Sequence, residues 1–339
     1  MTFQIVNRKT GTEFEVQPSE TVLDAAGRQG HAFTYSCRSG SCGSCRAKLL
    51  SGEIEPIAAP VQGLSEKEAQ AGMILLCQAR PKTNLIIEAT ELPAGSVLPI
   101  RTLPCRITEL NKACHDVMIV QLKLPQNQEF QYLPGQYIDI LLRDGRRRSF
   151  SIANLPDQEA GIELHVRLVP GGHFSQQVFS TLKERDLLRF QGPFGTFFLR
   201  EDDDLPAIMV AGGTGLAPIK AILESAFARS CRRTFHLFWG VRDARDLYLH
   251  EQLNDWASQY PDFDYTPVLS EGEATSGWAG ARGWVHEAVL QKFPDLSSVE
   301  VYASGPPPMI EAIKTAFAAA GLSNDRLFFD SFEFAADSA

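Results

Sequence analysis

Four cysteines in the first quarter of the chain have the residue type and spacing to hold iron. Cys37, Cys42 and Cys45 follow the pattern C-x4-C-x2-C, and 31 residues separate Cys45 from Cys77. This is the spacing of a plant-type [2Fe–2S] site, in which four thiolates ligate two irons. The Gly and Ser residues between the cysteines let backbone N–H groups turn toward the sulfurs, which helps to set the potential of a cluster. The sequence therefore predicts an iron–sulfur cluster on these four thiolates.

A structural zinc site is the alternative for the same thiols. Such sites usually combine two C-x2-C pairs, whereas this region has one, Cys42 with Cys45. The spacing therefore favours the cluster. The other three cysteines, Cys105, Cys114 and Cys231, match no motif, and we expect them to be small buried hydrophobic residues.

A glycine turn in the second half of the chain has the pattern of a phosphate-binding loop. Gly213-Thr214-Gly215 follows an apolar strand pattern, and Pro218 stands in the first turn of the helix expected next. Glycines at such a turn let the backbone approach a pyrophosphate at the helix N-terminus. An ordinary tight turn between strand and helix is the alternative. The context favours binding of a dinucleotide.

A basic stretch in the middle third could bind a flavin nucleotide. Arg148, Ser149, Phe150 and Ser151 fit R-x-[YF]-S, and Arg148 and Phe150 share one face of a strand. An Arg pairs with phosphate, and an aromatic ring lies against a ring system. The alternative is a solvated basic hairpin turn. Further along, Gly172 and Ser175 form a second pyrophosphate cradle at a helix start.

Length and composition bound the class of protein. The chain has 339 residues, 44% hydrophobic and 22% charged, which indicates a globular protein of two or three domains. Residues 201–339 carry ten Lys and Arg against twenty-one Asp and Glu, a balance that disfavours nucleic-acid binding. We find no apolar run of membrane-spanning length and no signal-peptide pattern, and we expect a cytoplasmic protein.

The spacing of apolar residues predicts the organisation of the chain. Residues 1–91 read as an α+β β-grasp ferredoxin unit, and the Pro- and Gly-containing residues 92–99 read as a linker. Its expected strands are 3–6, 13–16, 47–50 and 85–89, with a helix over 21–29 capped by Ser19 and a second helix capped by Ser65.

The remaining residues show two further patterns. Residues 100–203 contain short strand patterns separated by turn residues, which predicts an antiparallel β-barrel for FAD. Residues 204–339 alternate strands with helices, which predicts a doubly wound α/β domain for NAD(P).

Taken together, these motifs resemble the ferredoxin–NADP⁺ reductase superfamily, in the subgroup with an N-terminal plant-type ferredoxin. The cysteine motif, RxFS, Gly172-x-x-Ser175, GxGxxP and the late segment 305–309 appear in the family order. The resemblance covers essentially the whole chain. Three stretches, 147–154, 162–167 and 195–198, are most similar to the CDP-6-deoxy-Δ3,4-glucoseen reductases, which supply electrons for 3-deoxysugar formation. The reductase components of ring-hydroxylating and other multicomponent oxygenases share the same plan.

The resemblance implies roles for single residues. Arg148 would pair with an FAD phosphate, Phe150 would face the isoalloxazine, and Ser151 would hydrogen-bond to flavin N5. Phe332 would be the C-terminal aromatic residue near the flavin, although a core residue is an equal alternative. The resemblance implies a wider set of cofactor-binding residues: Arg148, Ser149, Phe150, Ser151, His165, Arg167, Gly172, Ser175, Gly213, Thr214, Gly215, Pro218, Gly305 and Pro306.

The sequence departs from the family pattern at two positions. The family often has Tyr where Phe150 stands, so the stacking face is kept and a hydroxyl is lost. It often has Cys on the hydride path where this chain has Ser304. We count Ser304 with Ser151 and Phe332 as candidate catalytic residues.

The implied activity is electron transfer from NAD(P)H to FAD, then to the [2Fe–2S] cluster, then to a protein partner. The partner would be a sugar-nucleotide dehydrase or an oxygenase component. A protein of another class, a redox sensor or docking module without turnover, is the third alternative. NADH is expected in preference to NADPH, because Asp243 and Asp246 follow the second strand of the last domain. Arg242 and Arg245 favour the opposite choice.

Overall fold

The fold is described from a computed structural model of the chain. The structure describes residues 2–56, 61–93, 95–157, 161–201, 204–271 and 277–332. The chain divides into two compact units, Met1–Pro99 and Ile100–Ala339. Among the described residues, no helix is long and apolar enough to cross a bilayer.

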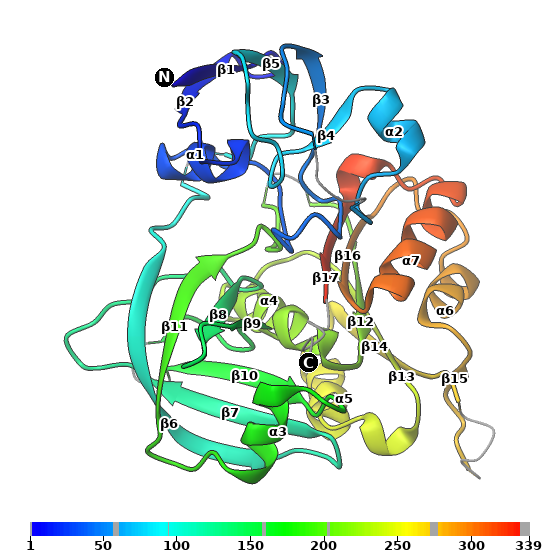
Figure 1. Cartoon of the computed structure of the whole chain (residues 1–339). Helices are drawn as coiled ribbons and strands as arrows, with labels where there is room; N and C mark the ends of the chain where they lie inside the picture. The colour runs from blue at the N-terminus through cyan, green and yellow to red at the C-terminus, as the bar shows by residue number, and fades with distance from the viewer. Residues whose placement is uncertain are drawn as a thin grey trace. The chain divides into compact units, whose positions relative to one another are not determined.

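The first unit is a mixed five-stranded sheet with one main helix (Figure 1). The strand order is β2-β1-β5-β3-β4, and β1 and β5 run parallel. Val22, Leu23, Ala25 and Ala26 form the buried stripe of α1 against the sheet. The elements are β1 (Phe3–Asn7), β2 (Thr12–Val16), α1 (Val22–Arg28), β3 (Arg46–Ser51), α2 (Glu66–Gln70), β4 (Met73–Leu75) and β5 (Leu85–Glu88).

The two predicted helix caps have different outcomes. Ser65 caps α2 in a capping box with Glu68, as the sequence predicts. The prediction that Ser19 caps α1 is wrong, because Thr21 occupies the N-cap and its hydroxyl accepts from the Asp24 N–H at 3.2 Å. Thr21 stands directly before the first buried turn, which is where a cap has to lie.

The second unit begins with an antiparallel six-stranded sheet of order β10-β7-β6-β11-β8-β9. An antiparallel bridge between Ile152 and Leu164 joins its two ends, so the sheet closes into a barrel. The barrel core contains Ile107, Val120, Ile138 and Phe190. The elements are β6 (Arg101–Lys112), β7 (Val117–Lys123), β8 (Tyr137–Leu141), β9 (Arg147–Ser151), β10 (Ile162–Arg167), α3 (His173–Ser180) and β11 (Leu187–Phe194).

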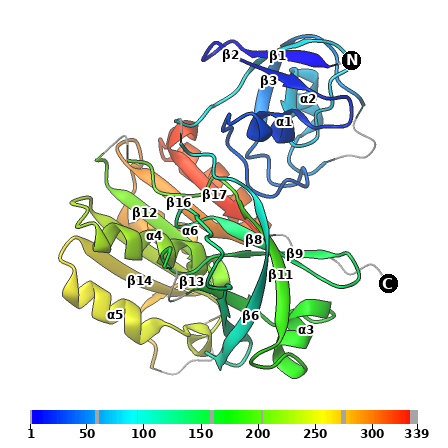
Figure 2. The same ribbon diagram turned by 90° about the vertical axis from the view of Figure 1, so that its left-hand side faces the viewer.

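The same unit continues as a parallel six-stranded sheet of order β15-β14-β13-β12-β16-β17. Helices α4 and α5 pack on one face and α6 and α7 on the other (Figure 2). The sheet strands are β12 (Ala207–Gly212), β13 (Phe235–Val241), β14 (Phe263–Leu269), β15 (Ala281–Arg282), β16 (Glu300–Gly305) and β17 (Leu327–Ser331). The helices are η1 (Gly213–Gly215), α4 (Leu216–Ala228), η2 (Ala244–Asp246), α5 (His250–Gln259), α6 (Val285–Lys292), α7 (Pro307–Ala319) and η3 (Asn324–Arg326).

The three predicted fold classes are therefore confirmed. The sequence reading missed β6, where Pro104 interrupts the strand pattern, and it missed β17. Strand β17 is important for the site because it pairs with β16 and brings Asp330 beside Ser304. The predicted boundaries of the linker and of the two halves of the second unit stay predictions.

Candidate cofactor sites

The four predicted cluster cysteines come together in two pairs on the first unit. The side chains of Cys37 and Cys42 interact with each other, and so do those of Cys45 and Cys77. The neighbouring Cys42 side chain lowers the pKa of Cys37, and the Cys45 side chain lowers the pKa of Cys77. Four thiols arranged two and two fit a cluster of two irons, each of which needs two protein sulfurs.

Backbone N–H groups point at these sulfurs, as the Gly- and Ser-rich loop predicts. The Cys42 N–H donates to Cys37 Sγ at 3.4 Å, and the Ser44 N–H donates to Cys42 Sγ at 3.5 Å. Gln78 adds a side-chain donor, with its Nε2 3.7 Å from Cys77 Sγ. Such donors stabilise negative charge on the sulfurs and so favour ligation by thiolate.

Glycines let the cysteine loop fold this tightly. Gly43 has a φ of +75°, and a Cβ there would lie 2.7 Å from the Gly63 carbonyl oxygen. A Cβ on Gly63 would lie 2.6 Å from both the Gly40 oxygen and the Gly43 nitrogen. Arg46 clamps the same segment, since its Nε donates to the Gly63 oxygen at 2.9 Å. The loop shape is therefore set by close backbone packing.

In the second unit, β9 presents the predicted flavin residues on alternate faces. Phe150 is half-buried and packs on Phe174 with ring centroids 5.4 Å apart. Arg148 lies on the same strand face, and burial and the nearby charge of Arg146 lower the pKa of its guanidinium. An anionic phosphate would relieve this crowding of positive charge. Ser149 faces away and donates to Asp139 Oδ1 at 2.6 Å.

The second predicted cradle lies at the start of α3. Gly172 is the N-cap of the helix. The buried Ser175 hydroxyl accepts from the Val169 N–H and donates to the Gly172 oxygen, both at 3.1 Å. The hydroxyl therefore holds the turn in shape, and the backbone at the helix start is the part that fits a pyrophosphate.

The glycine turn after β12 lies against β16. Gly213 to Gly215 form η1, and Leu216 begins α4 with Pro218 in its first turn. A Cβ on Gly215 would lie 2.0 Å from the Ser304 carbonyl oxygen, so only glycine fits. Trp239 Nε1 donates to the Gly213 oxygen at 2.9 Å and fixes the turn. Thr214 lies between the two glycines in the same turn.

Ser151 is hydrogen-bonded to Asp330, and Ser304 is paired with Asp330 in the strand register. The buried Ser151 hydroxyl donates to Asp330 Oδ2 at 3.2 Å, across 179 residues of sequence. Ser304 is fully buried, stands opposite Asp330 in the β16–β17 register, and its Oγ has no hydrogen-bond partner among the described atoms. A buried unpaired hydroxyl is costly unless a ligand or water satisfies it. This orphan group fits the resemblance, which places Ser304 on the nicotinamide path.

Phe332 follows directly after these residues. Its N–H donates to the Gly305 oxygen at 3.0 Å, and its side chain is half-buried. Gly305 packs on Gly212, and Pro306 is the N-cap of α7. The structure thus places Ser151, Ser304 and Phe332 around the ends of β9, β16 and β17.

Two predicted cofactor residues are engaged with protein groups. Both ring nitrogens of the buried His165 have partners, Tyr248 at 2.9 Å and Glu163 at 3.0 Å. Arg167 Nε donates to Asp116 Oδ2 at 2.8 Å, while its Nη1 lies 3.0 Å from where a Cβ of Gly213 would be. Arg167 therefore faces the glycine turn, whereas His165 faces the interior.

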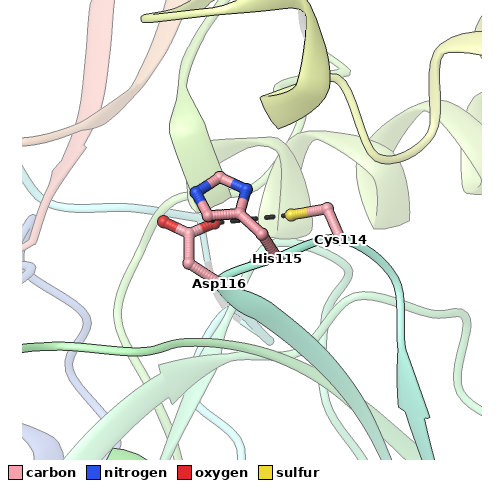
Figure 3. A group of neighbouring side chains, drawn as sticks. All are labelled: Cys114, His115 and Asp116. Atoms are coloured by element: carbon pink, nitrogen blue, oxygen red, sulfur yellow. Dashed lines mark hydrogen bonds and ion pairs between the residues drawn. The ribbon is translucent and has the colours of Figure 1, made fainter.

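Cys114, His115 and Asp116 form a group of metal-ligand types at the turn between β6 and β7 (Figure 3). The Cys114 thiol donates to Asp116 Oδ1 at 3.4 Å. The prediction that Cys114 is a buried small hydrophobic residue is wrong, because it is half-buried and paired with a carboxylate. Arg167 and Arg242 already approach Asp116, so a divalent cation here would meet two guanidinium groups. We assign no metal to this group.

The sequence reading missed Asp330 and a buried charged group around Lys220. Lys220 stands on the face of α4 that also carries the buried Leu216 and Leu223. A lysine on an apolar helix face is a sequence signal for a buried ion pair. The sequence around Asp330 contains no motif that indicates a functional residue, because its role follows from the pairing of β16 with β17.

Three protein families match consecutive parts of the chain. Residues 5–82 match the 2Fe-2S iron-sulfur cluster binding domain, residues 104–199 the oxidoreductase FAD-binding domain, and residues 209–315 the oxidoreductase NAD-binding domain. The cofactors are therefore a [2Fe–2S] cluster, FAD and NAD(P)H.

Full-length relatives and a solved structure have the same organisation. The CDP-6-deoxy-L-threo-D-glycero-4-hexulose-3-dehydrase reductase of Yersinia pseudotuberculosis is 40% identical over 98% of this chain and 99% of its own. The xylene/toluene monooxygenase electron transfer component XylA of Pseudomonas putida is 36% identical over 96% and 92%. The crystal structure of the Amycolatopsis cytochrome P450 reductase GcoB is 34% identical, with a TM-score of 0.80 over 98% and 99%. The chain belongs to the ferredoxin reductase family and is an NAD(P)H-dependent iron–sulfur flavoprotein reductase.

Proposed function

We propose that this reductase passes electrons from NADH through FAD and the [2Fe–2S] cluster to a sugar-nucleotide dehydrase, for 3-deoxysugar formation. The observation that carries the proposal is the 40% identity, over nearly the full length of both chains, to a reductase named for a CDP-6-deoxyhexulose dehydrase. We place the activity in the cytoplasm, where ligand cysteines are kept reduced.

The proposed division of labour follows the two units. Cys37 with Cys42, and Cys45 with Cys77, would each hold one iron in the first unit. In the second unit Arg148 would bind a flavin phosphate, and Phe150 would lie against the flavin ring. The glycine turn from Gly213 to Gly215 would hold the pyrophosphate of NADH.

FAD supplies the conversion between a two-electron hydride and the single electrons that a cluster accepts. The chain's own residues prepare the place where this happens. Ser151, held by Asp330, would present its hydroxyl at the flavin, and Phe332 would cover the ring until the nicotinamide arrives. Ser304 would contact the nicotinamide, which would give its orphan hydroxyl a partner.

The choice of NADH over NADPH is part of the proposal. Asp243 follows β13, the position where an acidic residue accepts from a ribose 2′-OH and repels a 2′-phosphate. Its carboxylate also accepts from the Arg245 N–H, while Asp246 accepts from the Asp243 N–H at 3.1 Å, so both shape this turn. Steady-state kcat/KM for the two nucleotides tests the choice, and a higher value for NADPH would reverse it.

An oxygenase component is the second candidate partner, because one relative at 36% identity is named as the electron transfer component of a xylene/toluene monooxygenase. The test is reconstitution of the purified full chain with a CDP-6-deoxy-L-threo-D-glycero-4-hexulose 3-dehydrase and its sugar substrate. We expect NADH consumption and deoxygenated sugar only when both proteins are present. NADH-linked product with an aromatic oxygenase, and none with the dehydrase, would establish the second candidate instead.

A further inference from the structure

A buried charged group joins the barrel to the nucleotide-binding half of the second unit. Lys220 on α4 is only 6% exposed, and its ammonium group has three acceptors. It donates to the Ala153 carbonyl at 2.9 Å and lies 3.1 Å from Glu163 Oε1 and 2.8 Å from Glu224 Oε1. An ammonium group has three N–H donors, so all three are satisfied, two of them by the barrel.

Glu163 on β10 is the centre of this group. Its Oε1 accepts a hydrogen bond from His165 Nε2 at 3.0 Å and also contacts the Lys220 ammonium group. Its Oε2 accepts a hydrogen bond from Gln121 Nε2 at 2.7 Å. Burial raises the pKa of Glu163, but the His165 hydrogen bond and the Lys220 charge outweigh it and lower the pKa to about 2. Glu163 is therefore a carboxylate at neutral pH and holds the Lys220 ammonium.

His165 provides a second link between the two halves. Burial lowers its pKa, so the ring is neutral at neutral pH, with the Nε2 hydrogen donated to Glu163 and Nδ1 accepting from the Tyr248 hydroxyl at 2.9 Å. Tyr248 lies between η2 and α5 and packs edge-on against Trp239, at 5.2 Å between ring centroids. Trp239 in turn donates to the glycine turn at Gly213.

Both links end close to the residues proposed for the cofactors. Ala153 is two residues beyond Ser151, on the segment that carries the flavin residues. Lys220 is two residues beyond Pro218, in the helix that starts at the glycine turn. The Lys220–Ala153 hydrogen bond therefore connects the two cofactor-carrying segments through one side chain.

We propose that Lys220, Glu163 and Tyr248 are positioning residues for hydride transfer, which hold the nucleotide-binding half against the barrel at the spacing where nicotinamide meets flavin. In that step NAD(P)H loses a hydride to the flavin ring and becomes NAD(P)⁺. The residues touch neither reacting ring and act through the Ser151 segment and the glycine turn.

The physical reason lies in what a buried ion pair contributes. Desolvation offsets most of the attraction between the two charges, so the intact pair adds little net stability. What it does provide is a single relative arrangement of the two groups that it joins. Hydride transfer requires reacting atoms at near-contact distance, and a displacement of about 1 Å can lower the rate about 100-fold. A fixed contact between the two halves therefore affects the rate of hydride transfer as well as the stability of the fold.

The test is single-turnover reduction of bound FAD by NADH in the full chain carrying Lys220→Met. We expect the rate constant to fall about 10- to 100-fold. The isotope effect with NADH deuterated at nicotinamide C4 should rise, because the hydride has farther to travel. A merely structural role would reduce the amount of flavin-loaded protein, but it would leave the rate constant per flavin and the isotope effect unchanged.

Lys292→Met is the matched control. Lys292 is a half-exposed lysine on α6, in the same half of the unit, and pairs with Asp264 at 3.5 Å. Its loss should leave the rate constant within about 2-fold. Equal rate constants and isotope effects for Lys220→Met and the unchanged chain would overturn the proposal.

Tyr248→Phe decides the matter if Lys220→Met does not fold. It removes only the hydroxyl that reaches His165 and keeps the ring that packs on Trp239. We expect a rate constant lower by about 3-fold or more, the effect of one lost hydrogen bond. An unchanged rate constant and isotope effect would overturn the proposal. None of these measurements needs an electron-accepting partner, so they leave the partner proposal untouched.

Discussion

The cysteine loop of the first unit and the flavin–nucleotide region of the second are held in place in different ways. The loop depends on short-range backbone packing, such as Gly43 against Gly63. The flavin–nucleotide region depends on side chains that meet across long stretches of sequence, such as Ser151 with Asp330. The difference suggests that local changes destroy the first site, whereas the second can be weakened in steps by loosening contacts between its two halves.

Replacement of a proposed cluster ligand should have the largest effect, and it should separate the function of the first unit from that of the second. We expect Cys45→Ser to lower partner reduction by more than about 100-fold, since even outer-shell changes at metal sites cost 10- to 100-fold. NADH-dependent ferricyanide reduction should stay within about 2-fold, because that route needs only the second unit. Iron and sulfide analysis checks the loss of the cluster. Cys231→Ser is the control, and an equal loss of iron there would contradict the ligand assignment.

Ser151→Ala should weaken the flavin site without emptying it. The change removes the hydroxyl proposed to face flavin N5 and frees Asp330 Oδ2 from its bond. Loss of one hydrogen bond at a reacting atom lowers the rate by about 100-fold, so we expect the rate constant of flavin reduction to fall by about that factor. Rapid-mixing measurement of flavin reduction gives the value. Ser180→Ala, on the exposed face of α3, serves as control, and equal rates for the two variants would place Ser151 away from the reaction.

Glu163→Gln should show how much the buried ion pair with Lys220 contributes to the stability of the second unit. Removing one partner of a buried ion pair costs about 3 kcal/mol of unfolding free energy near neutral pH. The folded pKa of Glu163 is about 2, below its ordinary value near 4.5, so this stabilisation is complete above about pH 4.5 and disappears as the pH falls toward 2. Denaturant unfolding of both chains across that window should show the difference shrinking with acid. If the difference in unfolding free energy between the two chains stayed constant across this pH range, the charge of the Glu163 carboxylate would not be its cause.

A pair of glycine substitutions should test the backbone packing of the first unit. Gly63→Ala places a Cβ 2.6 Å from backbone atoms of Gly40 and Gly43, which should cost about 1–3 kcal/mol and lower cluster occupancy. Gly27→Ala meets nothing within 4 Å on α1 and should stabilise the unit by about 1 kcal/mol. Thermal unfolding followed by visible absorbance of the cluster measures both. Equal effects of the two changes would contradict the close packing of the loop.

The same difference decides how much the sequence could predict. Cys37, Cys42 and Cys45 lie within nine residues, so their spacing alone indicates their chemistry. The barrel, the parallel sheet and the glycine turn also follow from local patterns. Asp330 and the Lys220–Glu163 pair could not be predicted, because their roles arise only when distant strands and helices pack together. His165 illustrates the limit, since the family resemblance implied a cofactor-binding residue, whereas both its ring nitrogens are bound by protein groups.

The role of the cluster as the exit for electrons can be tested with two proteins, the full chain and a chain that begins at Ile100, where the second compact unit starts. Both proteins, loaded with FAD, are given NADH and either ferricyanide or the protein acceptor, and the two rates are measured. We expect the shortened chain to reduce ferricyanide at nearly the full rate and to lose its reduction of the protein acceptor. Reduction of the protein acceptor at the full rate would contradict this expectation, because electrons would then leave without the cluster.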